Sequence, residues 1–367
     1  MKICVTGSNG FIGKNLCIRL REKNIYEVYE ITRETTPNEL TSYLTNADFI
    51  FHCAGVNRPK DNKEFQSGNV DYLKLITDRL QSLGRNVPIA LTSSTQVSKS
   101  NDYGKTKLKG ETILEEYSKK SGAPHYIYRL PNVFGKWSKP NYNSFIATFC
   151  HNTINGIDIE IHDPNSKVKL SYIDDVCDAF LLLLDGKNHS GHQTVLNEFT
   201  TTVGEVAEII KSFKSSRQNL TVEPVGNGLT RALYSTYISY FSPDQFSYKI
   251  TSHTDERGVF CEMIKTLDSG QISFFTAHPG ITRGGHYHHT KNEKFLVIKG
   301  NAQFKFKNID TGERYILNVD GSTPTIIDTI PGWAHDITNI GQEDLVVMLW
   351  ANEIFDPEKT DTITQLL

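Results

Sequence analysis

Short apolar runs alternate with helix-forming stretches through the first half of the chain. The apolar runs lie at residues 2–6, 25–31, 48–54 and 87–91. An amphipathic helix is predicted directly after residue 13, a polar helix over residues 64–83, and another helix over residues 108–117. Strands that alternate with helices at this spacing predict a Rossmann-type, doubly wound parallel sheet, and such sheets bind ligands beyond the carboxyl ends of their strands.

The pattern changes after residue 243. Short alternating stretches, separated by Gly, Pro, Asn and Asp, lie at residues 260–266, 271–276, 294–298, 302–307 and 345–350. They predict a compact antiparallel all-β domain of the jelly-roll type. A length of 367 residues is enough for two domains. We therefore predict an α/β domain over residues 1–243 and a β-domain over residues 244–367, with residues 140–240 supplying a substrate lobe to the first.

Composition limits the partners of the chain. The net charge is −3, no run is rich in Lys or Arg, and no segment approaches about 18 uninterrupted apolar residues. These features do not favour a nucleic-acid or membrane partner. The first residues read as a buried strand rather than a signal peptide, so we predict a cytoplasmic protein. Six scattered cysteines without a C-x-x-C pair predict buried, reduced thiols. The many strand edges of the second domain suggest a homodimer.

A glycine-rich loop follows the first apolar run. Gly7 permits a tight turn, Gly10 lets the backbone approach a pyrophosphate, and Gly13 allows close helix packing. The required strand precedes the loop and the required helix follows it, so we predict a dinucleotide site with phosphates at the helix N-terminus. The predicted cofactor-binding residues of this loop are Gly7, Ser8, Asn9, Gly10, Phe11, Ile12 and Gly13.

The end of the second strand indicates which dinucleotide is bound. An acidic residue there would accept a hydrogen bond from the ribose 2′-hydroxyl of NAD. The chain has Thr32 and Arg33 instead. Arg33 suits the 2′-phosphate of NADP, which favours NADPH, although Glu34 beside it leaves an ordinary surface arginine as the alternative.

A phenol and a cation lie one helical turn apart at Tyr103 and Lys107. We expect the lysine to lower the pKa of the phenol and make Tyr103 a usable general acid. Ser94 follows the fourth strand, where its hydroxyl can hydrogen-bond a substrate carbonyl. These three residues are the predicted catalytic group of the first domain, although each alone also fits an ordinary surface position.

The ordered motifs of the first 240 residues resemble an extended short-chain dehydrogenase/reductase acting on nucleotide sugars. The resemblance rests on the glycine loop, residues 52–54, 69–70, 92–94, Tyr103 with Lys107, residues 129–135 and residues 171–176. It implies that Ser94 and Tyr103 hold and protonate a sugar ketone, and that Lys107 also binds the nicotinamide ribose. It also implies that Asn132 lies near cofactor and substrate. Ser98 departs from the family, which often has tyrosine there.

Histidines and a carboxylate are spaced as metal ligands in the second domain. His286 and His288 alternate along one predicted strand, so both should face one side. Glu293 and His335 should come from neighbouring strands that face the same interior. Three imidazoles and one carboxylate predict a divalent metal site, with zinc favoured by tetrahedral N/O ligation.

Residues 244–367 resemble a cupin, and this resemblance leaves two roles open for His286. Cupins bind metals through residues at these spacings. The segments around Arg257 and Arg283, however, also resemble metal-free cupin epimerases of 4-keto-6-deoxy sugars. That second resemblance implies that both arginines contact the nucleotide sugar and that His286 is a general base. One lone pair cannot serve both roles; we favour the metal because His288, Glu293 and His335 complete a ligand set.

The whole chain resembles a family of bifunctional enzymes of capsular polysaccharide synthesis, with a reductase first and a cupin second. This resemblance implies a UDP-linked 2-acetamido-2,6-dideoxy-4-ulose as substrate. The cupin would epimerise C-3, and the reductase would then reduce the C-4 ketone with NADPH to a 6-deoxy-talosamine, a precursor of UDP-N-acetyl-L-fucosamine. Two alternatives stay open: a reductase whose cupin only binds sugar or mediates assembly, and a non-catalytic nucleotide-sensing module.

Overall fold

The computed structural model describes every residue except Lys359, and it divides the chain into two compact units. The first unit comprises Met1–Lys211 and Arg231–Phe241, and the second comprises Ser212–Thr230 and Ser242–Leu367. The chain enters the second unit for the last time after Phe241, two residues before the predicted domain boundary at residue 243. The earlier excursion of residues 212–230 into the second unit was not predicted.

The first unit contains the predicted parallel sheet. Its six strands are ordered β2-β1-β3-β4-β5-β8, and all neighbours run parallel. Its elements are β1 Lys2–Thr6, α1 Phe11–Glu22, β2 Glu27–Ile31, α2 Pro37–Asn46, β3 Phe49–His52, α3 Lys63–Gln66, a π-helical turn Ser67–Asp71, α4 Tyr72–Ser82, β4 Ile89–Ser94, a 3-10 turn Thr95–Ser98, α5 Asp102–Ser121, β5 His125–Leu130, α7 Ile173–Leu182 with a 3-10 turn Leu183–Asp185, and β8 Gly191–Gln193.

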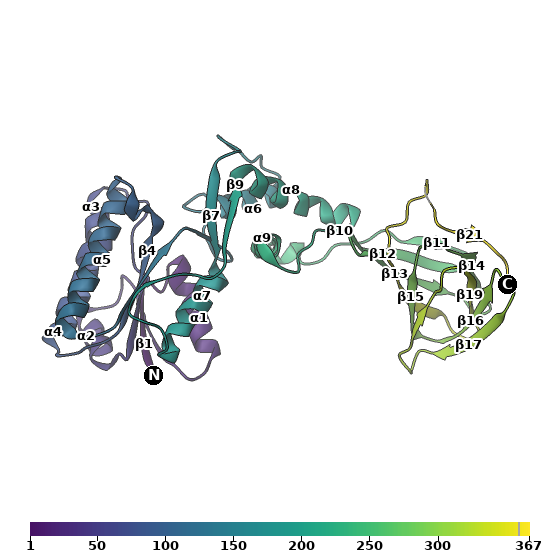
Figure 1. The fold of residues 1–367 in the computed structure, drawn as a ribbon, viewed down its shortest axis with the longest axis horizontal. Helices are drawn as coiled ribbons and strands as arrows, with labels where there is room; N and C mark the ends of the chain where they lie inside the picture. Colours follow the sequence, from purple (N-terminus) through teal and green to yellow (C-terminus); the bar gives the residue numbers. More distant parts are fainter. Residues whose placement is uncertain (359) are drawn as a thin grey trace. The chain divides into compact units, whose positions relative to one another are not determined.

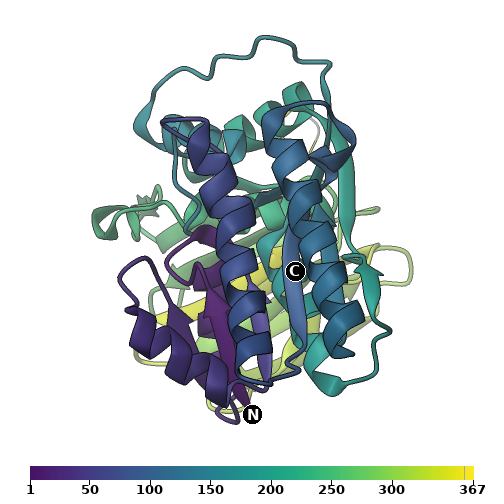
Figure 2. The same cartoon turned by 90° about the vertical axis from the view of Figure 1, so that its left-hand side faces the viewer.

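Helices cover both faces of this sheet (Figure 1). On one face α2, α4 and α5 bury residues such as Leu44, Ile76 and Leu114 against the strands, and Figure 2 shows α4 and α5 side by side in front of the sheet. On the other face α1 and α7 bury Leu16 and Phe180. This three-layer core confirms the predicted fold class of the first domain and places the carboxyl ends of the strands at one edge.

A smaller three-stranded sheet and three helices form the region that was predicted to supply the substrate lobe. The strands are ordered β6-β7-β9, with β6 and β7 parallel and β7 and β9 antiparallel. The elements are β6 Asn132–Phe134, α6 Phe145–Asn155, β7 Lys167–Tyr172, β9 Glu198–Thr202, α8 Val203–Asn219, which runs on into the second unit, and α9 Gly228–Ile238.

The second unit is a β-sandwich of two mainly antiparallel sheets. One sheet has the order β10-β12-β13-β20-β15-β18 with β11 beside β12, and the other has the order β17-β16-β19-β14-β21. The strands are β10 Thr221–Val222, β11 His253–Asp255, β12 Gly258–Thr266, β13 Gly270–Ala277, β14 Thr282–Tyr287, β15 Glu293–Lys299, β16 Asn301–Asn308, β17 Arg314–Asp320, β18 Ile326–Asp328, β19 Trp333–Asn339, β20 Leu345–Ala351 and β21 Ile363–Thr364, with a 3-10 turn Pro243–Gln245 before them.

Aromatic and aliphatic side chains from both sheets fill the space between them. Phe275, Phe295 and Val347 come from one sheet, and Phe304 and Ile337 come from the other. Each of the five stretches predicted as strands is a strand, longer than predicted by one or two residues. The all-β prediction for the second domain is confirmed.

Residues 212–230 join the second unit because they supply one of its strands. The Thr221–Val222 strand pairs in parallel with Lys265 and Thr266 of β12, and the Lys265 amide donates to the Leu220 carbonyl at 2.7 Å. A strand of two residues is too short to show an alternation of apolar and polar side chains. The sequence pattern therefore did not predict it.

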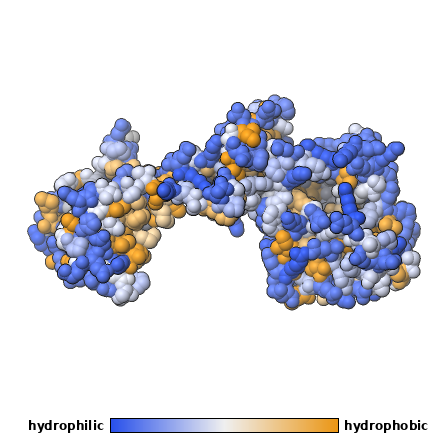
Figure 3. Space-filling model, turned by 180° about the vertical axis from the view of Figure 1, so that it is seen from behind, coloured by the Kyte–Doolittle hydropathy of each residue, from blue (hydrophilic) through white to orange (hydrophobic). Residues whose placement is uncertain are grey.

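The surface drawn in Figure 3 is mainly hydrophilic, and the cysteines are unpaired. No helix among the described residues is both long enough and apolar enough to span a bilayer. Hydrophilic residues cover most of the face drawn in Figure 3, with apolar residues scattered among them. All six cysteines are free thiols, and five of them are buried.

Candidate functional site

The glycine loop of the first unit joins β1 to α1 in a turn that side chains would disrupt. Gly7 has φ +65°, and a Cβ on it would lie 2.8 Å from the Ala54 Cα. A Cβ on Gly13 would lie 2.3 Å from the Gly7 carbonyl oxygen, so the helix packs directly on the loop. Gly10 caps α1 without a side-chain hydrogen bond, and no acidic residue lies in its first turn. This helix N-terminus can therefore receive a phosphate group.

The other loop residues divide into two groups. Asn9, Phe11 and Ile12, like Gly10, line a cavity of about 760 Å³. Ser8 is buried, and its hydroxyl donates to the Ile31 carbonyl at 3.3 Å. Ser8 thus ties the loop to the end of β2 and does not line that cavity.

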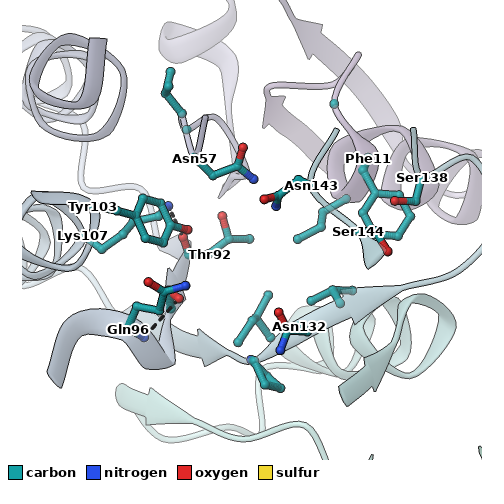
Figure 4. Close-up of a pocket in the computed structure, with 18 of the residues that line it drawn as sticks. Phe11, Asn57, Thr92, Gln96, Tyr103, Lys107, Asn132, Ser138, Asn143 and Ser144 are labelled. Atoms are coloured by element: carbon teal, nitrogen blue, oxygen red, sulfur yellow. Dashed lines mark hydrogen bonds between the residues drawn. The ribbon is translucent and has the colours of Figure 1, made fainter. Parts of the chain in front are cut away.

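The same cavity brings together the predicted catalytic residues. Ser94, Tyr103, Lys107 and Asn132 all line it (Figure 4). They come from the end of β4, the first two turns of α5 and the start of β6. Other polar residues that no sequence motif assigned to the site also line the cavity, among them Asn57, Gln96, Ser138, Asn143 and Ser144. They lie in turns and loops, where no periodic pattern marks them.

Lys107 is held in a buried position beside the predicted acid. Its Nζ donates to the Thr92 carbonyl at 2.8 Å and lies 6.0 Å from the centroid of the Tyr103 ring. A Cβ on Gly55 would lie 3.1 Å from Nζ, so the glycine leaves room for the ammonium group. Burial lowers the pKa of Lys107 to about 8, which leaves the amine mainly charged at pH 7.

The pKa of Tyr103 differs from the expectation. Burial raises it above the usual value, and the hydrogen bond with Ser94 only partly offsets that effect. The pKa of Tyr103 is thus raised, opposite to the lowering that the spacing of Tyr103 and Lys107 predicted, because desolvation of the buried phenol dominates. Tyr103 therefore stays protonated at neutral pH, which suits a proton donor.

Ser94 is fixed for contact with the tyrosine. It is the last residue of β4, and its Oγ accepts a hydrogen bond from the Gln96 amide at 3.2 Å. Ser98, the departure noted in the sequence, closes the following 3-10 turn by donating to the Thr95 carbonyl. Asn132 is exposed in the cavity, and its side chain donates to the Lys169 carbonyl at 3.3 Å.

A π-helical turn interrupts the helix predicted over residues 64–83. The turn Ser67–Asp71 brings Asn69 inward, where its Oδ1 accepts from the Val56 amide and its Nδ2 donates to the Val56 carbonyl, both at 2.9 Å. Nδ2 also lies 3.2 Å from the Thr106 hydroxyl. Asn69 thus ties the loop after β3 to α5 beside Lys107.

Arg33 lies just beyond the end of β2, as expected. Its side chain is exposed and is not among the residues that line the large cavity. This position is the one at which a dinucleotide's adenosine ribose meets the second strand of such a sheet.

The second unit gathers all four predicted metal ligands. One donor atom from each of His286, His288, Glu293 and His335 lies within 4.8 Å of every other. His335 belongs to β19, and Glu293 belongs to β15 of the facing sheet, so the group lies between the two sheets. β14 ends at Tyr287, and its register shifts between Gly284 and His286. His288 therefore follows the strand rather than lying in it.

The spacing of these donors fits a tetrahedral ion. Glu293 Oε2 lies 3.3 Å from His288 Nε2 and 3.3 Å from His335 Nε2. Bonds of about 2.0–2.1 Å around a tetrahedral zinc give donor separations of about 3.3 Å. His335 Nε2 is buried, and although it lies 3.3 Å from Glu293 Oε2, the geometry between them does not form a hydrogen bond. A nitrogen directed at a cation has this arrangement.

The ionisation of the cluster also suits ligation. Burial lowers the pKa of His286 to about 4, and His335 adds to the effect. Burial raises the pKa of the Glu293 carboxyl, but contacts with His288, His335 and Lys291 outweigh it and hold that pKa well below its usual range. At neutral pH the cluster thus offers a neutral imidazole at His286 and a carboxylate at Glu293.

Arg257 and Arg283 lie close together in the second unit. Arg257 forms an ion pair with Asp255 at 2.5 Å, and the same carboxylate lies 3.9 Å from Arg283. Arg283 is on β14, as is His286, and its guanidinium lies 5.3 Å from the Phe275 ring centroid while its Nε donates to the Thr276 carbonyl. Both arginines can receive an anionic ligand, and Arg257 is the more exposed.

Two segments of the chain match described families. Residues 3–80 and 79–197 match the NAD dependent epimerase/dehydratase family. Residues 253–363 match the polysaccharide biosynthesis C-terminal domain.

Individual proteins match all or part of the chain. The chain is 52% identical over 363 residues to UDP-2-acetamido-2,6-beta-L-arabino-hexul-4-ose reductase of Pseudomonas aeruginosa, covering 99% of this chain and 98% of the relative. It resembles the crystal structure of the capsular polysaccharide assembling protein CapF from Staphylococcus aureus with a TM-score of 0.93 and 42% identity over 100% of both chains. UDP-glucuronic acid 4-epimerase from Bacillus cereus shares the fold of 59% of the chain, with a TM-score of 0.53 and 19% identity over 85% of its own length.

Proposed function

The chain belongs to the NAD dependent epimerase/dehydratase family and, over its full length, to the family of CapF and the Pseudomonas aeruginosa reductase, and from this premise we propose two successive reactions. The substrate is a UDP-linked 2-acetamido-2,6-dideoxy-4-ulose. The second unit inverts C-3, and the first unit then reduces the C-4 ketone to a UDP-linked 6-deoxy-talosamine, the precursor of UDP-N-acetyl-L-fucosamine in capsule synthesis. The name of the Pseudomonas aeruginosa relative, a reductase of a 4-ulose, supports the second step.

The reduction uses the cavity that contains Ser94, Tyr103 and Lys107. NADPH, when bound, supplies the hydride that goes to C-4. Ser94 holds the ketone oxygen by a hydrogen bond, and Tyr103 donates its phenolic proton to that oxygen as the C–O double bond becomes a single bond. Lys107 stabilises the phenolate that remains. Asn132 contacts the ligand from the start of β6.

The epimerisation uses the second unit, and the gathering of His286, His288, Glu293 and His335 is the observation that supports it. These four residues would hold a divalent metal, with zinc favoured by the N/O donor set. Such an ion, when bound, supplies Lewis-acid stabilisation of the enolate that forms when C-3 loses its proton. Arg257 and Arg283 would bind the diphosphate of the substrate. In this proposal His286 is a ligand, and the C-3 base is another group.

Two measurements test the epimerase proposal. In D₂O, without NADPH, the purified protein is expected to place solvent deuterium at C-3 of the 4-keto sugar nucleotide, and metal analysis is expected to find about one divalent ion per chain. A strong chelator should abolish the exchange while NADPH-dependent reduction of the epimerised ketone continues. Exchange that persists in metal-free protein would return His286 to the role of base.

Deuterium exchange and NADPH consumption together distinguish the proposal from the two alternatives. A second unit that only binds sugar or mediates assembly would leave C-3 without deuterium even with metal present. A non-catalytic nucleotide-sensing module would consume no NADPH with the 4-keto substrate. The homodimer and the cytoplasmic location expected from the sequence remain predictions.

The preference for NADPH rests on Arg33. We expect Arg33→Ala to lower the ratio of kcat/KM for NADPH to that for NADH by about 10–100-fold, since a charged hydrogen bond contributes about 1.5–3 kcal/mol. Lys23→Ala removes another exposed cation of the same unit and serves as the control. An unchanged ratio in Arg33→Ala would make Arg33 an ordinary surface residue and would leave the choice of cofactor open.

A further inference from the structure

The segment around β21 is built into the wall of the four-ligand cluster. Its strand Ile363–Thr364 pairs antiparallel with β14, with Thr364 opposite His286 and Ile363 opposite Tyr287. The Gln365 amide donates to the Gly285 carbonyl at 2.8 Å. More than seventy residues of sequence separate this segment from the histidines that it touches.

Asp361, just before this strand, binds the turn that connects two of the ligands. Its carboxylate accepts hydrogen bonds from the successive backbone amides of His289, Thr290 and Lys291, at 2.9, 2.6 and 2.8 Å. It also accepts from the Thr290 hydroxyl at 2.9 Å. Consecutive N–H groups that converge on one anion fix the backbone of a turn. This turn separates His288 from Glu293.

The backbone of Asp361 acts on His288 directly. The Asp361 carbonyl contacts His288 Nδ1, and because a carbonyl can only accept, Nδ1 carries the hydrogen. A metal can then be bound only through Nε2, the atom 3.3 Å from Glu293 Oε2; without an ion between them, Nε2 would have to donate to that carboxylate. A hydrogen bond from the second ring nitrogen is how metal-binding histidines are oriented.

The side chain of Lys291 forms an ion pair with Glu293, another member of the cluster. Its backbone amide is held by Asp361, and its Nζ lies 3.3 Å from Glu293 Oε1. Glu293 Oε2 is the oxygen that faces His288 and His335. Lys291 thus occupies one carboxylate oxygen and leaves the other free for a single bond to an ion.

We propose that Asp361 is a positioning residue of the four-ligand cluster. Its carboxylate anchors the 289–291 turn and its carbonyl fixes the Nδ1–H tautomer of His288, so that His288 Nε2 and Glu293 Oε2 converge on one point. The proposal deepens the proposed function and rests on the cluster being a metal site. Sequence spacing could not reveal it, since an aspartate near the end of the chain matches no ligand pattern.

The test compares Asp361→Ala and the isosteric Asp361→Asn with the wild type. Zn²⁺ affinity is measured by chelator competition, and the ligand field is measured from the absorption spectrum of the Co²⁺-loaded protein. Loss of an outer-shell partner typically weakens metal binding by about 10–100-fold, and we expect that loss together with a changed Co²⁺ spectrum. Asp320→Ala removes a comparable turn aspartate, which accepts from the Ser322 amide at 2.7 Å, and should change neither quantity.

The outcomes separate this inference from the proposed function. Wild-type affinity and an unaltered Co²⁺ spectrum in both Asp361 variants would overturn the positioning role while leaving the metal site intact. If the wild type itself binds no Zn²⁺ or Co²⁺, the metal proposal fails, and the ring ¹⁵N NMR shifts of His288 decide the inference. Both variants keep the Asp361 backbone carbonyl, so loss of the Nδ1 hydrogen in both would show that the carboxylate places that carbonyl, and it would support the inference. A hydrogen on Nδ1 in all three proteins refutes it.

Discussion

Tyr103→Phe is expected to slow NADPH-dependent ketone reduction by about 10²–10⁴-fold, the contribution of a positioned general acid. The substitution keeps the ring but removes the only proton that the phenol can donate. Burial raises the pKa of Tyr103, so the wild-type residue is in its proton-donating form at neutral pH. Because the change lies in the first unit, we expect C-3 deuterium exchange by the second unit to continue at the wild-type rate.

The measurement is NADPH oxidation with the epimerised ketone, alongside mass-spectrometric detection of deuterium at C-3. Tyr43→Phe alters a phenol outside the cavity and is the matched control. Wild-type reduction by Tyr103→Phe would mean that another group protonates the oxygen. Loss of both activities would show that the two sites are not separable.

His288→Ala is expected to have the opposite effect. The substitution removes one of four donors and leaves Glu293 Oε2 with only one of its two contacts at 3.3 Å, the one with His335. We expect metal retention and C-3 exchange to fall to the background level, because the ion that stabilises the enolate is no longer held. Reduction of a ketone already epimerised at C-3 should continue.

His289→Ala is the control for this variant. Its side chain is exposed, and only its backbone amide contacts Asp361, a contact that alanine preserves. If His288→Ala loses metal yet still exchanges deuterium at C-3, the ion has no part in the chemistry. If His289→Ala behaves like His288→Ala, the effect comes from the turn and not from the missing ligand.

The sequence predicted correctly those features that are formed by residues close together in the chain. The glycine loop could be predicted because Gly7, Gly10 and Gly13 serve one turn and one helix end. His286 and His288 are separated by one residue, which indicated a shared site. The spacing of apolar residues in the strands and helices predicted the fold class, because each element buries one face against the common core.

Features that depend on distant partners could not be predicted. Asp361 reaches the histidine turn across about seventy residues, and its type and surroundings carry no pattern. The interruption of the helix at Asn69 depends on hydrogen bonds to Val56. The pKa of Tyr103 was predicted in the wrong direction because the sequence showed the nearby cation but not the burial of the phenol.

The excursion of residues 212–230 also limits how the protein can be divided. The chain crosses between the units after Lys211, after Thr230 and after Phe241. A gene cut after residue 243 would leave the Thr221–Val222 strand on the reductase fragment and expose the edge of β12 on the other. The two units are therefore interleaved along the chain, and two independently expressed proteins would require genes in which the separate segments of each unit are rejoined.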